Sequence, residues 1–389
     1  MKKLAVITTH PIQYNAPLFE LLAKRGKLDV KVFYTWGSDV LESKYDPGFQ
    51  REVAWDIPLL EGYDYTFVNN VAKQRGSHHF FGIDNPTLCS EISAWDADAV
   101  LVFGWSFKSH LKAIRFFYKK KKLLFRGDST FVAAQPWFKS LIRQQFLKFV
   151  YRHVDICLYV GTNNRNYYKR CRVVDTKLLF APHAVDNDRF YDCDGNYQLK
   201  ADKWKAELGI EPEAVTLLFA GKLTKDKNAQ LLIDTLPLLS GTHFPVHLII
   251  VGNGEFETSL KSMAAGNTHI HFVPFQNQAM MPVVYRLGDI FVMPTLTSDT
   301  WGLAINEAMA SGRAVVVSNR CGAAVDLVKE GKNGFVFNST DPVDFRNKIL
   351  ILCQDKNLCL NMGAISGEMI KKWSLLQVAE AIENAVNIG

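Results

Sequence analysis

The chain has 389 residues, and its 48% hydrophobic and 22% charged content predicts a water-soluble globular protein large enough for two domains. No apolar run approaches the roughly 20 residues that span a bilayer, and the opening MKKLAVITTH lacks a signal-peptide cleavage site, so it is predicted to be a buried strand. The formal net charge of +6 comes from the N-terminal half: residues 1–195 hold 28 Lys and Arg against 20 Asp and Glu, and the rest holds 17 against 19.

Apolar strand patterns alternate with helical patterns in both halves, which predicts parallel sheets covered by helices. The predicted strands are Leu4–Thr8, Val30–Tyr34, Ala99–Phe103, Lys122–Arg126, Ile156–Val160 and Lys177–Ala181, then Thr216–Ala220, His247–Val251, Ile270–Val273, Asp289–Met293, Ala314–Ser318 and Gly334–Phe337. The predicted helices are Pro17–Arg25, Lys108–Tyr118, Trp137–His153, Ala229–Leu239, Glu255–Ala265, Met280–Leu287, Ala304–Ala310, Asp341–Leu352 and Trp373–Val386.

These patterns predict an α/β fold of two doubly wound, Rossmann-like domains that face an interdomain cleft. The expected parts are an N-terminal domain over 1–191, a linker over 192–199, a C-terminal domain over 200–372, and a closing helix over 373–389 that packs back on the N-terminal domain. The linker is predicted from the polar, glycine-containing segment DCDGNYQ. Functional residues are expected at the carboxyl ends of the strands, where ligands collect in such folds.

The stretch PTLTSDTWGLAINE, Pro294–Glu307, carries the strongest functional signal. It follows a predicted strand, turns at Gly302 and opens a predicted helix, so it brings backbone N–H groups and a helix N-terminus to one point, where phosphate binds well. Asp299 and Glu307 flank that point. Carboxylates do not bind phosphate but accept hydrogen bonds from sugar hydroxyls, so this arrangement predicts a sugar nucleotide as the ligand.

Two glycine-containing turns follow earlier strands of the same half. The segment FAGKLTKDK offers Lys222 and Lys227 as compact cations for a diphosphate, although a solvated loop before a charged helix start explains the same residues. The segment VGNG lacks the third glycine of a dinucleotide fingerprint. Gly252 and Gly254 are therefore explained at least as well by packing as by contact with a ligand.

Two segments of the N-terminal half, Thr9–Asn15 and Phe125–Ser129, also follow predicted strands and are expected to open into the cleft. His10, Arg126 and Asp128 are their candidates for holding the acceptor or the reacting hydroxyl. A histidine in a turn and an Arg–Asp pair at the surface explain the same residues without any function.

The sequence gives little support for a metal or a cofactor. The chain contains three Asp-x-Asp pairs, which are Asp96/Asp98, Asp186/Asp188 and Asp192/Asp194. The first precedes a strand and the other two lie in the expected interdomain segment, so none is predicted to hold a catalytic metal. Seven cysteines are scattered without a CxxC pair, which favours free thiols in a reducing cytosol over disulfides or a structural zinc site.

Five segments in order, PHAVDNDRF, FAGKLTKDKN, VGNGEFETSL, PTLTSDTWGLAINEAMASG and CGAAVDLVKEGKNGFVF, resemble the C-terminal half of a retaining glycosyltransferase of the GT-B fold, family 4, also called glycosyl transferases group 1. The resemblance covers residues 180–340, and the N-terminal half, which binds the acceptor in such families, matches only in general pattern. The chain departs from the family where Asp299 replaces the first Glu of Glu-x7-Glu, Lys222 replaces Arg, and Asp326 replaces a late Glu. Each change keeps the charge, so a variant of the family site is expected.

The resemblance implies a role for each candidate residue. Asp299 is expected to hold the donor sugar and Glu307 the ribose, and Lys222 and Lys227 are expected to hold the diphosphate. The rest of the nucleotide site is expected to consist of Gly221, Gly252, Gly254 and the backbone of Thr300, Trp301, Gly302 and Leu303. In the front-face mechanism usually proposed for the family, the leaving phosphate takes the acceptor proton, so a strong protein base is not required.

The expected function is that of a retaining, metal-independent glycosyltransferase. It would move a hexose-type sugar from a nucleoside diphosphate sugar, with UDP or GDP as the nucleotide, to an acceptor hydroxyl in the synthesis of bacterial surface polysaccharide, such as lipopolysaccharide, or of a lipid-linked saccharide. Two alternatives stay open: a non-catalytic, sugar-nucleotide-binding partner of a membrane assembly, and a sugar-nucleotide epimerase of similar fold.

The segment 108–153 concentrates basic charge, since Lys108–Arg152 holds twelve basic residues and one acid. Its predicted second helix carries an apolar stripe of Phe138, Ile142, Phe146, Phe149 and Val150. Basic residues beside aromatic ones on a helix favour an anionic membrane surface, whereas a core helix with solvated lysines explains the same pattern. The protein is therefore expected in the cytoplasm, with peripheral contact at the inner face of the cytoplasmic membrane, and no nucleic-acid partner is expected.

Overall fold

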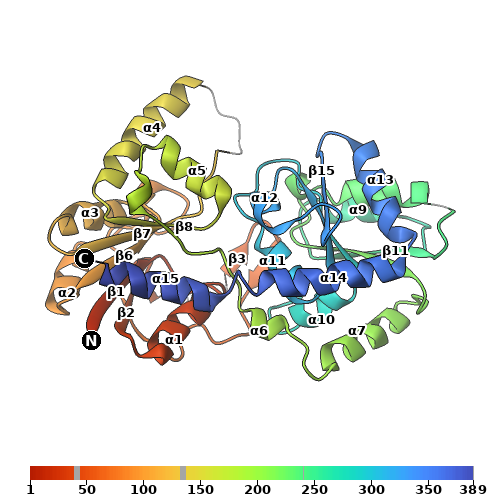
Figure 1. Cartoon of the computed structure of the whole chain (residues 1–389), viewed down its shortest axis with the longest axis horizontal. Helices are drawn as coiled ribbons and strands as arrows, with labels where there is room; N and C mark the ends of the chain where they lie inside the picture. The colour runs from red at the N-terminus through yellow and green to blue at the C-terminus, as the bar shows by residue number, and fades with distance from the viewer. Residues whose placement is uncertain (39–43, 132–136, 240, 389) are drawn as a thin grey trace. The chain divides into compact units, whose positions relative to one another are not determined.

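The computed structural model describes residues 1–38, 44–131, 137–239 and 241–388 (Figure 1). The chain divides into two compact units, each built on a parallel sheet. The first unit comprises Met1–Ser43, Ile57–His183 and Ser374–Gly389, and the second comprises Lys44–Asp56 and Ala184–Trp373. Among the described residues, none of the helices is long and apolar enough to cross a membrane.

The first unit contains a seven-stranded sheet in the order β5-β2-β1-β6-β7-β8-β9, with every neighbouring pair parallel. Its strands are β1 (Lys2–Thr8), β2 (Leu28–Tyr34), β5 (Asp64–Phe67), β6 (Ala99–Phe103), β7 (Lys122–Arg126), β8 (Ile156–Tyr159) and β9 (Leu178–Phe180). The central strands β1, β6 and β7 are nearly continuous runs of buried apolar residues, because helices cover both faces of the sheet.

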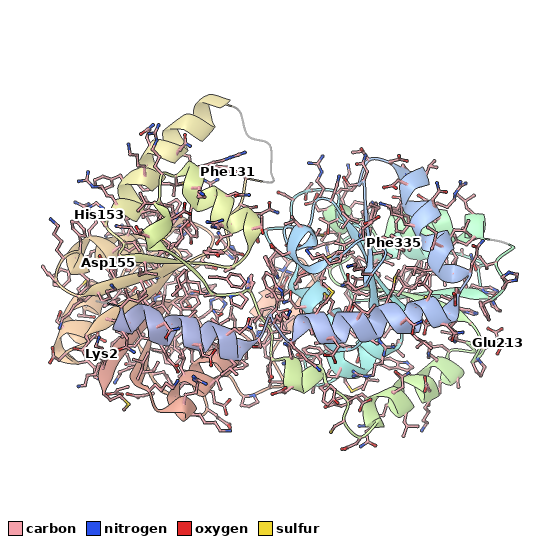
Figure 2. All side chains as sticks on the ribbon, viewed as in Figure 1. Lys2, Phe131, His153, Asp155, Glu213 and Phe335 are labelled. Atoms are coloured by element: carbon pink, nitrogen blue, oxygen red, sulfur yellow. The ribbon has the colours of Figure 1, made fainter. Side chains whose placement is uncertain are left out.

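One face of this sheet shares a buried core with α2 (Leu88–Ala94), α3 (Lys108–Phe117), α4 (Trp137–Arg152) and α5 (Thr162–Arg170). The other face is covered by α1 (Ala16–Arg25) and the C-terminal helix α15 (Leu375–Asn387) (Figure 1). Two polar contacts fix α15 in the first unit. Lys2, labelled in Figure 2, donates to the carbonyl of Val386 at 3.1 Å, and Arg25 makes two hydrogen bonds of 2.6 and 2.9 Å to the Glu383 carboxylate.

The second unit contains a six-stranded parallel sheet in the order β12-β11-β10-β13-β14-β15. Its strands are β10 (Val215–Ala220), β11 (Val246–Val251), β12 (Ile270–Val273), β13 (Ile290–Met293), β14 (Ala314–Ser318) and β15 (Gly334–Phe337). Counted along this unit, the order is 3-2-1-4-5-6, that of a doubly wound Rossmann-like fold. The predicted α/β class and the parallel sheets are thus confirmed.

Helices pack around this second sheet in two groups. α8 (Gln230–Thr235), α9 (Glu257–Met263), α13 (Pro342–Cys353) and the first turns of α14 (Lys356–Ile370) share its main buried core. α6 (Asn187–Phe190), α7 (Asn196–Glu207), α10 (Met281–Arg286) and α11 (Leu303–Ala310) pack against one another, and α12 (Ala324–Leu327) follows β14. In the second group, α6 and α10 contact α11, the helix that the strongest motif of the sequence opens.

A hairpin that the sequence patterns did not predict belongs to the second unit. It consists of β3 (Lys44–Asp46) and β4 (Arg51–Val53), paired antiparallel, although it lies between β2 and β5 along the chain. The rings of Phe49 and Phe275 are 4.8 Å apart, and the Asn277 amide donates to the carbonyl of Ala54 at 2.6 Å. These contacts fix the hairpin to the loop that follows β12.

The boundary between the units differs from the predicted one. It falls between His183 and Ala184, so residues 184–191 pack in the second unit. The predicted linker is the start of α7, where the Asp192 carboxylate accepts the backbone N–H groups of Tyr197 at 3.1 Å and Gln198 at 2.8 Å. Polar residues and a glycine, interpreted as a linker, are here the capping residues of a helix.

Candidate functional site

In the second sheet the order of the strands reverses at β10: β11 and β12 follow on one side of it, and β13, β14 and β15 on the other. The loops after β10 and β13 therefore lead away from each other. Such a switch point leaves room for a ligand at the carboxyl ends of the strands. The loop after β10 carries Lys222 and Lys227, and the loop after β13 carries Asp299. The N–H of Leu296 donates to the carbonyl of Asp226 at 2.9 Å, so the two loops are hydrogen-bonded to each other.

Lys227 and Asp299 form an ion pair across these loops. The Nζ of Lys227 lies 2.6 Å from Oδ2 of Asp299, and the two side chains are 31% and 20% exposed. A partly exposed pair of this kind contributes at most about 1 kcal/mol to stability, so a ligand with its own charges and hydroxyls can replace either partner. The structure thus brings together one residue predicted for the diphosphate and one predicted for the donor sugar.

The Asp299 loop is held by the segment after β14. Gly322 N–H donates to the carbonyl of Asp299 at 2.9 Å, and a Cβ added to Gly322 would lie 1.9 Å from the carbonyl oxygen of Thr300. Only glycine permits this approach. Gly302 has a φ of +93°, in the left-handed region, and opens α11. The backbone from Thr300 to Leu303 therefore stands at a helix N-terminus, as predicted.

Two side chains beside this loop have structural roles. Trp301 is buried, donates through Nε1 to the Asn306 side chain at 2.9 Å, and packs against Trp373 with 5.3 Å between ring centroids. The backbone of Trp301 is also engaged, since its N–H donates to Oδ1 of Asp299 at 3.4 Å and its carbonyl accepts the N–H of Ala323 at 3.0 Å. Cys321 forms a β-bridge with Asp299, and burial, with the Asp299 charge, raises the pKa of its thiol to about 12, so the thiol stays protonated.

Lys222 pairs with an acid that the sequence analysis did not single out. Its Nζ lies 2.9 and 3.0 Å from the two carboxylate oxygens of Asp46 in the hairpin, and 5.0 Å from the ring centre of Phe49. Burial tends to raise the pKa of Asp46, but Lys222 and the backbone N–H groups of Gly48 and Phe49 outweigh it and lower that pKa overall. The lysine predicted to hold the diphosphate is therefore paired with an ionised carboxylate.

The glycines of the first two motifs serve close packing. A Cβ on Gly252 would lie 2.0 Å from the carbonyl oxygen of Gly221, and one on Gly254 would lie 2.5 Å from that of Leu223. The N–H of Leu223 also donates to the carbonyl of Asn253 at 2.9 Å. These contacts support the packing interpretation of Gly252 and Gly254, which shape the loop that carries Lys222.

Glu307 lies on α11 and is only 3% exposed. The hydroxyl of Tyr285 donates to its Oε2 at 2.6 Å, and Nη2 of Arg189 lies 3.9 Å from its Oε1. Arg189 belongs to PHAVDNDRF, which the sequence analysis quoted only as part of the resemblance. Tyr285 lies on a buried helix and gave no signal, because neither spacing nor composition distinguishes it from a core aromatic residue.

The candidates of the first unit lie after β1 and β7. Arg126 is buried and donates to the carbonyls of Ala181 and Pro182, each at 2.8 Å, and burial lowers the pKa of its guanidinium to about 10. The surface Arg–Asp pair considered for Arg126 and Asp128 is therefore wrong for the arginine, whose contacts serve the fold and give no support to an acceptor role. Asp128 is half-buried, and its charge acts on Arg126.

His10 stands directly after β1. Its Nδ1 lies 2.8 Å from the Thr9 hydroxyl, and its ring meets the edge of Trp36 with 4.9 Å between centroids. The side chain is half-buried, so it has both a fixed orientation and access to solvent. These properties suit a residue that contacts a substrate and equally a histidine in a structured turn.

Two of the three acidic pairs of the sequence contribute a carboxylate to structural contacts. Asp98 accepts the backbone N–H of Lys3 at 2.8 Å, and Asp192 caps α7 and lies 3.4 Å from Nε of Arg286. Across the described ranges, no group of three or more His, Cys, Asp or Glu side chains is arranged to hold a metal ion. The seven cysteines are free, and all but Cys193 are buried.

Comparison with known proteins supports the resemblance seen in the motifs. Residues 200–368 match the family model for glycosyl transferases group 1. The matched segment covers somewhat less than half of the chain. It lies wholly within the second unit, and it contains Lys222, Lys227, Asp299 and Glu307.

Two curated relatives match a longer part of the chain than the family model does. The chain is 29% identical over 246 residues to sulfoquinovosyl transferase SQD2 of Arabidopsis thaliana, which covers 61% of the chain and 45% of the relative. It is 27% identical over 248 residues to a GDP-mannose-dependent α-(1-6)-phosphatidylinositol monomannoside mannosyltransferase of Mycolicibacterium smegmatis, which covers 61% and 62%. The chain thus spans less than two thirds of the length of either relative.

Solved structures establish the fold over the whole chain. Sucrose-phosphate synthase from Thermosynechococcus elongatus has a TM-score of 0.73 at 14% identity and covers 100% of this chain and 98% of its own. Anabaena HepE, solved in complex with UDP and glucose, has a TM-score of 0.70 at 16% identity and covers 100% of both chains. The predicted GT-B fold is confirmed.

Proposed function

We propose that the protein is a glycosyltransferase that moves a hexose-type sugar, with retention, from a UDP- or GDP-sugar to an acceptor hydroxyl. One observation carries the proposal: the segment that matches group 1 glycosyl transferases places two lysines and two carboxylates at and just beyond the switch point of its sheet. The mannosyltransferase relative uses GDP-mannose by its name, and HepE binds UDP, which supports these two nucleotides.

In the proposed reaction, Lys222 and Lys227 hold the diphosphate and Asp299 accepts hydrogen bonds from the donor sugar. As the bond between sugar and phosphate breaks, negative charge grows on the diphosphate, and the fixed ammonium groups and the helix N-terminus of α11 stabilise it. The acceptor oxygen attacks the same face of the sugar, and its proton passes to the leaving phosphate. The charge on both lysines is already balanced by Asp299 and Asp46, so the donor must replace these carboxylates on binding.

No metal or cofactor enters this proposal. The lysines and the backbone N–H groups at the start of α11 supply the positive charge that a divalent ion supplies to a diphosphate in other enzymes. Transfer that continues undiminished in excess EDTA is the expected result. Activity that depends on added Mg²⁺ or Mn²⁺ would contradict this part of the proposal.

A surface of the first unit supports a lipid-linked acceptor or a membrane partner. Phe116 on α3 and Phe146 and Phe149 on α4 are 38%, 40% and 45% exposed. Lys119, Lys120, Lys148 and Arg152 are exposed beside them along the chain, and His153, labelled in Figure 2, packs on Phe149 with 4.7 Å between ring centroids. Phe138 and Ile142 of the predicted stripe lie outside the described side chains.

Exposed aromatic rings and cations suit peripheral contact with an anionic membrane, since each well-placed cation contributes about 1 kcal/mol. We therefore propose a cytoplasmic protein that binds the inner face of the membrane and acts in surface polysaccharide, lipopolysaccharide or lipid-linked saccharide synthesis. Co-sedimentation with vesicles containing phosphatidylglycerol, and not with phosphatidylcholine alone, is expected to weaken on Lys148→Glu.

The decisive test measures binding of UDP, GDP, ADP, CMP and dTDP by thermal shift, without added metal, to the wild type and to Glu307→Ala. One diphosphate is expected to raise the melting temperature of the wild type and not of the variant. Incubation with the corresponding sugar nucleotide then separates the alternatives. Release of the nucleoside diphosphate supports a transferase, release of none supports a non-catalytic binding protein, and an epimerised sugar nucleotide supports an epimerase.

A further inference from the structure

Three elements of the second unit bring polar side chains to Glu307. We call Arg189 of α6, Gln278 of the loop before α10, Tyr285 of α10 and Glu307 of α11 the carboxylate cluster. Gln278, Tyr285 and Glu307 are 7%, 1% and 3% exposed, and the Arg189 side chain is 17% exposed. Because these side chains are buried from solvent, the orientation of the Glu307 carboxylate is set by protein groups and not by water.

Tyr285 fixes one oxygen of that carboxylate. Its hydroxyl donates to Oε2 of Glu307 at 2.6 Å, a short hydrogen bond in a buried setting. The ring of Tyr285 has little freedom, because it packs between Phe190 and Phe291 with centroid distances of 5.9 and 5.5 Å. A rigid ring that donates to a carboxylate sets the plane of that carboxylate.

Arg189 supplies positive charge on the side of the other oxygen. Its Nη2 lies 3.9 Å from Oε1 of Glu307 and donates to the side-chain oxygen of Gln278 at 2.8 Å. The same helix that carries Tyr285 also holds the arginine in place, since Arg286 donates to the carbonyl of Phe190 at 2.7 Å. A buried carboxylate is ionised only if such compensation exists, and an ionised carboxylate is a stronger acceptor for a hydroxyl.

We infer that Tyr285 and Arg189 are positioning residues that hold Glu307 as an oriented, ionised acceptor for the ribose hydroxyls of the nucleotide. The inference rests on the proposed function, because it takes from it the contact between Glu307 and ribose. It adds that PHAVDNDRF, far from α11 along the chain, serves the nucleotide site through Arg189. The binding energy of the ribose therefore depends on two residues that do not touch it.

The test compares binding of each nucleoside diphosphate with binding of its 2′,3′-dideoxy analogue, using UDP and GDP and calorimetry. The ratio of the two dissociation constants measures recognition of the ribose hydroxyls alone. Tyr285→Phe removes a single oxygen and is expected to reduce that ratio about tenfold, the effect of one hydrogen bond to a charged group. Arg189→Met is expected to reduce it similarly, and Arg189→Lys, which keeps the charge, to restore part of it.

A matched control separates orientation from stability. Tyr34 of the first unit is also fully buried, and its hydroxyl lies 2.7 Å from that of Tyr63. Tyr34→Phe is expected to lower the melting temperature about as much as Tyr285→Phe and to leave the ribose ratio at the wild-type value. Combining Tyr285→Phe with Glu307→Gln should give little further loss beyond Glu307→Gln alone, because both changes remove one function.

The outcomes distinguish a failure of this inference from a failure of the proposed function on which it rests. If Glu307→Gln abolishes ribose recognition while Tyr285→Phe and Arg189→Met keep it, the positioning role is wrong and the proposed function stands. If the wild type binds neither UDP nor GDP, or binds each no better than its dideoxy analogue, both the ribose role of Glu307 and the inference fail. A reduced ratio in both positioning variants, with a normal ratio in Tyr34→Phe, supports the inference.

Discussion

In both units the first strand of the sheet lies between the second and the fourth, so each unit has a switch point at the carboxyl end of its first strand. In the second unit this point is lined by partly exposed charges, with Lys227 paired to Asp299 at 2.6 Å. In the first unit the corresponding place holds His110, which is fully buried. The same topology therefore places a charged pair at the switch point of one unit and a buried, neutral histidine beside that of the other.

His110 lies beside the switch point of the first unit and is held there by polar contacts. Its Nδ1 lies 3.1 and 3.0 Å from the carbonyl oxygens of Phe103 and Gly104, which only accept, so this nitrogen carries the proton. Its Nε2 lies 2.9 Å from the Thr35 hydroxyl. Burial lowers the pKa of His110 to about 4, so the ring is neutral at physiological pH. A neutral ring joins the ends of β2 and β6 without leaving charge for a ligand.

The largest effect is expected from removing a charge at the second unit's switch point. Lys227→Ala should raise the barrier of transfer by about 2–4 kcal/mol, about a 30- to 10³-fold loss in kcat/KM, because the growing charge on the diphosphate loses a fixed partner. The measurement is steady-state kinetics with the nucleotide sugar identified by thermal shift.

The matched control is a lysine of the first unit. Lys31 on β2 pairs with Asp64 on β5 at 3.3 Å, away from any proposed ligand contact. Lys31→Ala should leave kcat/KM within about twofold, and both variants should lose under about 1 kcal/mol of stability. Equal losses of activity in the two variants would mean that the charge at the switch point has no special role.

A second prediction concerns the stability of the first unit around His110 in acid. The folded pKa of His110, about 4, lies below the ordinary value of 6.5, so the unfolded chain binds the proton first as pH falls. Stability from the neutral ring is complete above pH 6.5 and is lost progressively between 6.5 and 4, amounting to about 2 kcal/mol between pH 7 and pH 5. Urea unfolding of the first unit should show this slope in the wild type.

His110→Gln removes the titrating group and keeps a polar side chain of similar reach. The variant is expected to be less stable at pH 7, but the part of the acid slope due to His110 should disappear. The difference between the two slopes isolates this residue from other groups that titrate in the same range. Parallel slopes in wild type and variant would show that His110 is already protonated in the folded protein.

Much of this fold follows from local pattern. Five strands have the predicted bounds: Ala99–Phe103, Lys122–Arg126, Ile270–Val273, Ala314–Ser318 and Gly334–Phe337. They are mainly apolar runs that are fully or partly buried, and such runs are specified by their own composition. β5 (Asp64–Phe67) and the hairpin strands β3 and β4 were missed, because they are short, polar and partly exposed, and only pairing with distant segments makes them strands.

The residues of the candidate site also fall into those that the local sequence predicts and those that only the packed fold brings together. Lys222, Lys227, Asp299 and Glu307 could be predicted because strand, turn and helix start are read locally, and the family motifs reinforce them. Their partners could not. Asp46 reaches Lys222 from a hairpin 176 residues earlier in the chain, and Arg189 reaches Glu307 across 118 residues, 307 minus 189. Pairings over such separations are decided by the packed fold and leave no periodic trace in a single sequence.

The hairpin has no counterpart in the comparison between the units. It lies between two strands of the first unit along the chain, but it packs in the second unit. Its Asp46 holds Lys222 where a diphosphate is proposed to bind. Asp46→Asn should therefore tighten binding of the preferred nucleoside diphosphate by up to about fivefold, since a partly exposed pair contributes at most about 1 kcal/mol.

Calorimetry with wild type, Asp46→Asn and Asp56→Asn checks this smallest effect. Asp56 follows the hairpin along the chain, and its carboxylate accepts the N–H of Ala279 at 3.0 Å. An asparagine at this position can accept the same bond, so the variant should bind like the wild type. Weaker binding in Asp46→Asn would reverse the interpretation: the acid would then orient Lys222 toward the diphosphate rather than compete with it. In either case a hairpin encoded between two strands of the first unit's sheet contributes a residue that tunes the second unit's site.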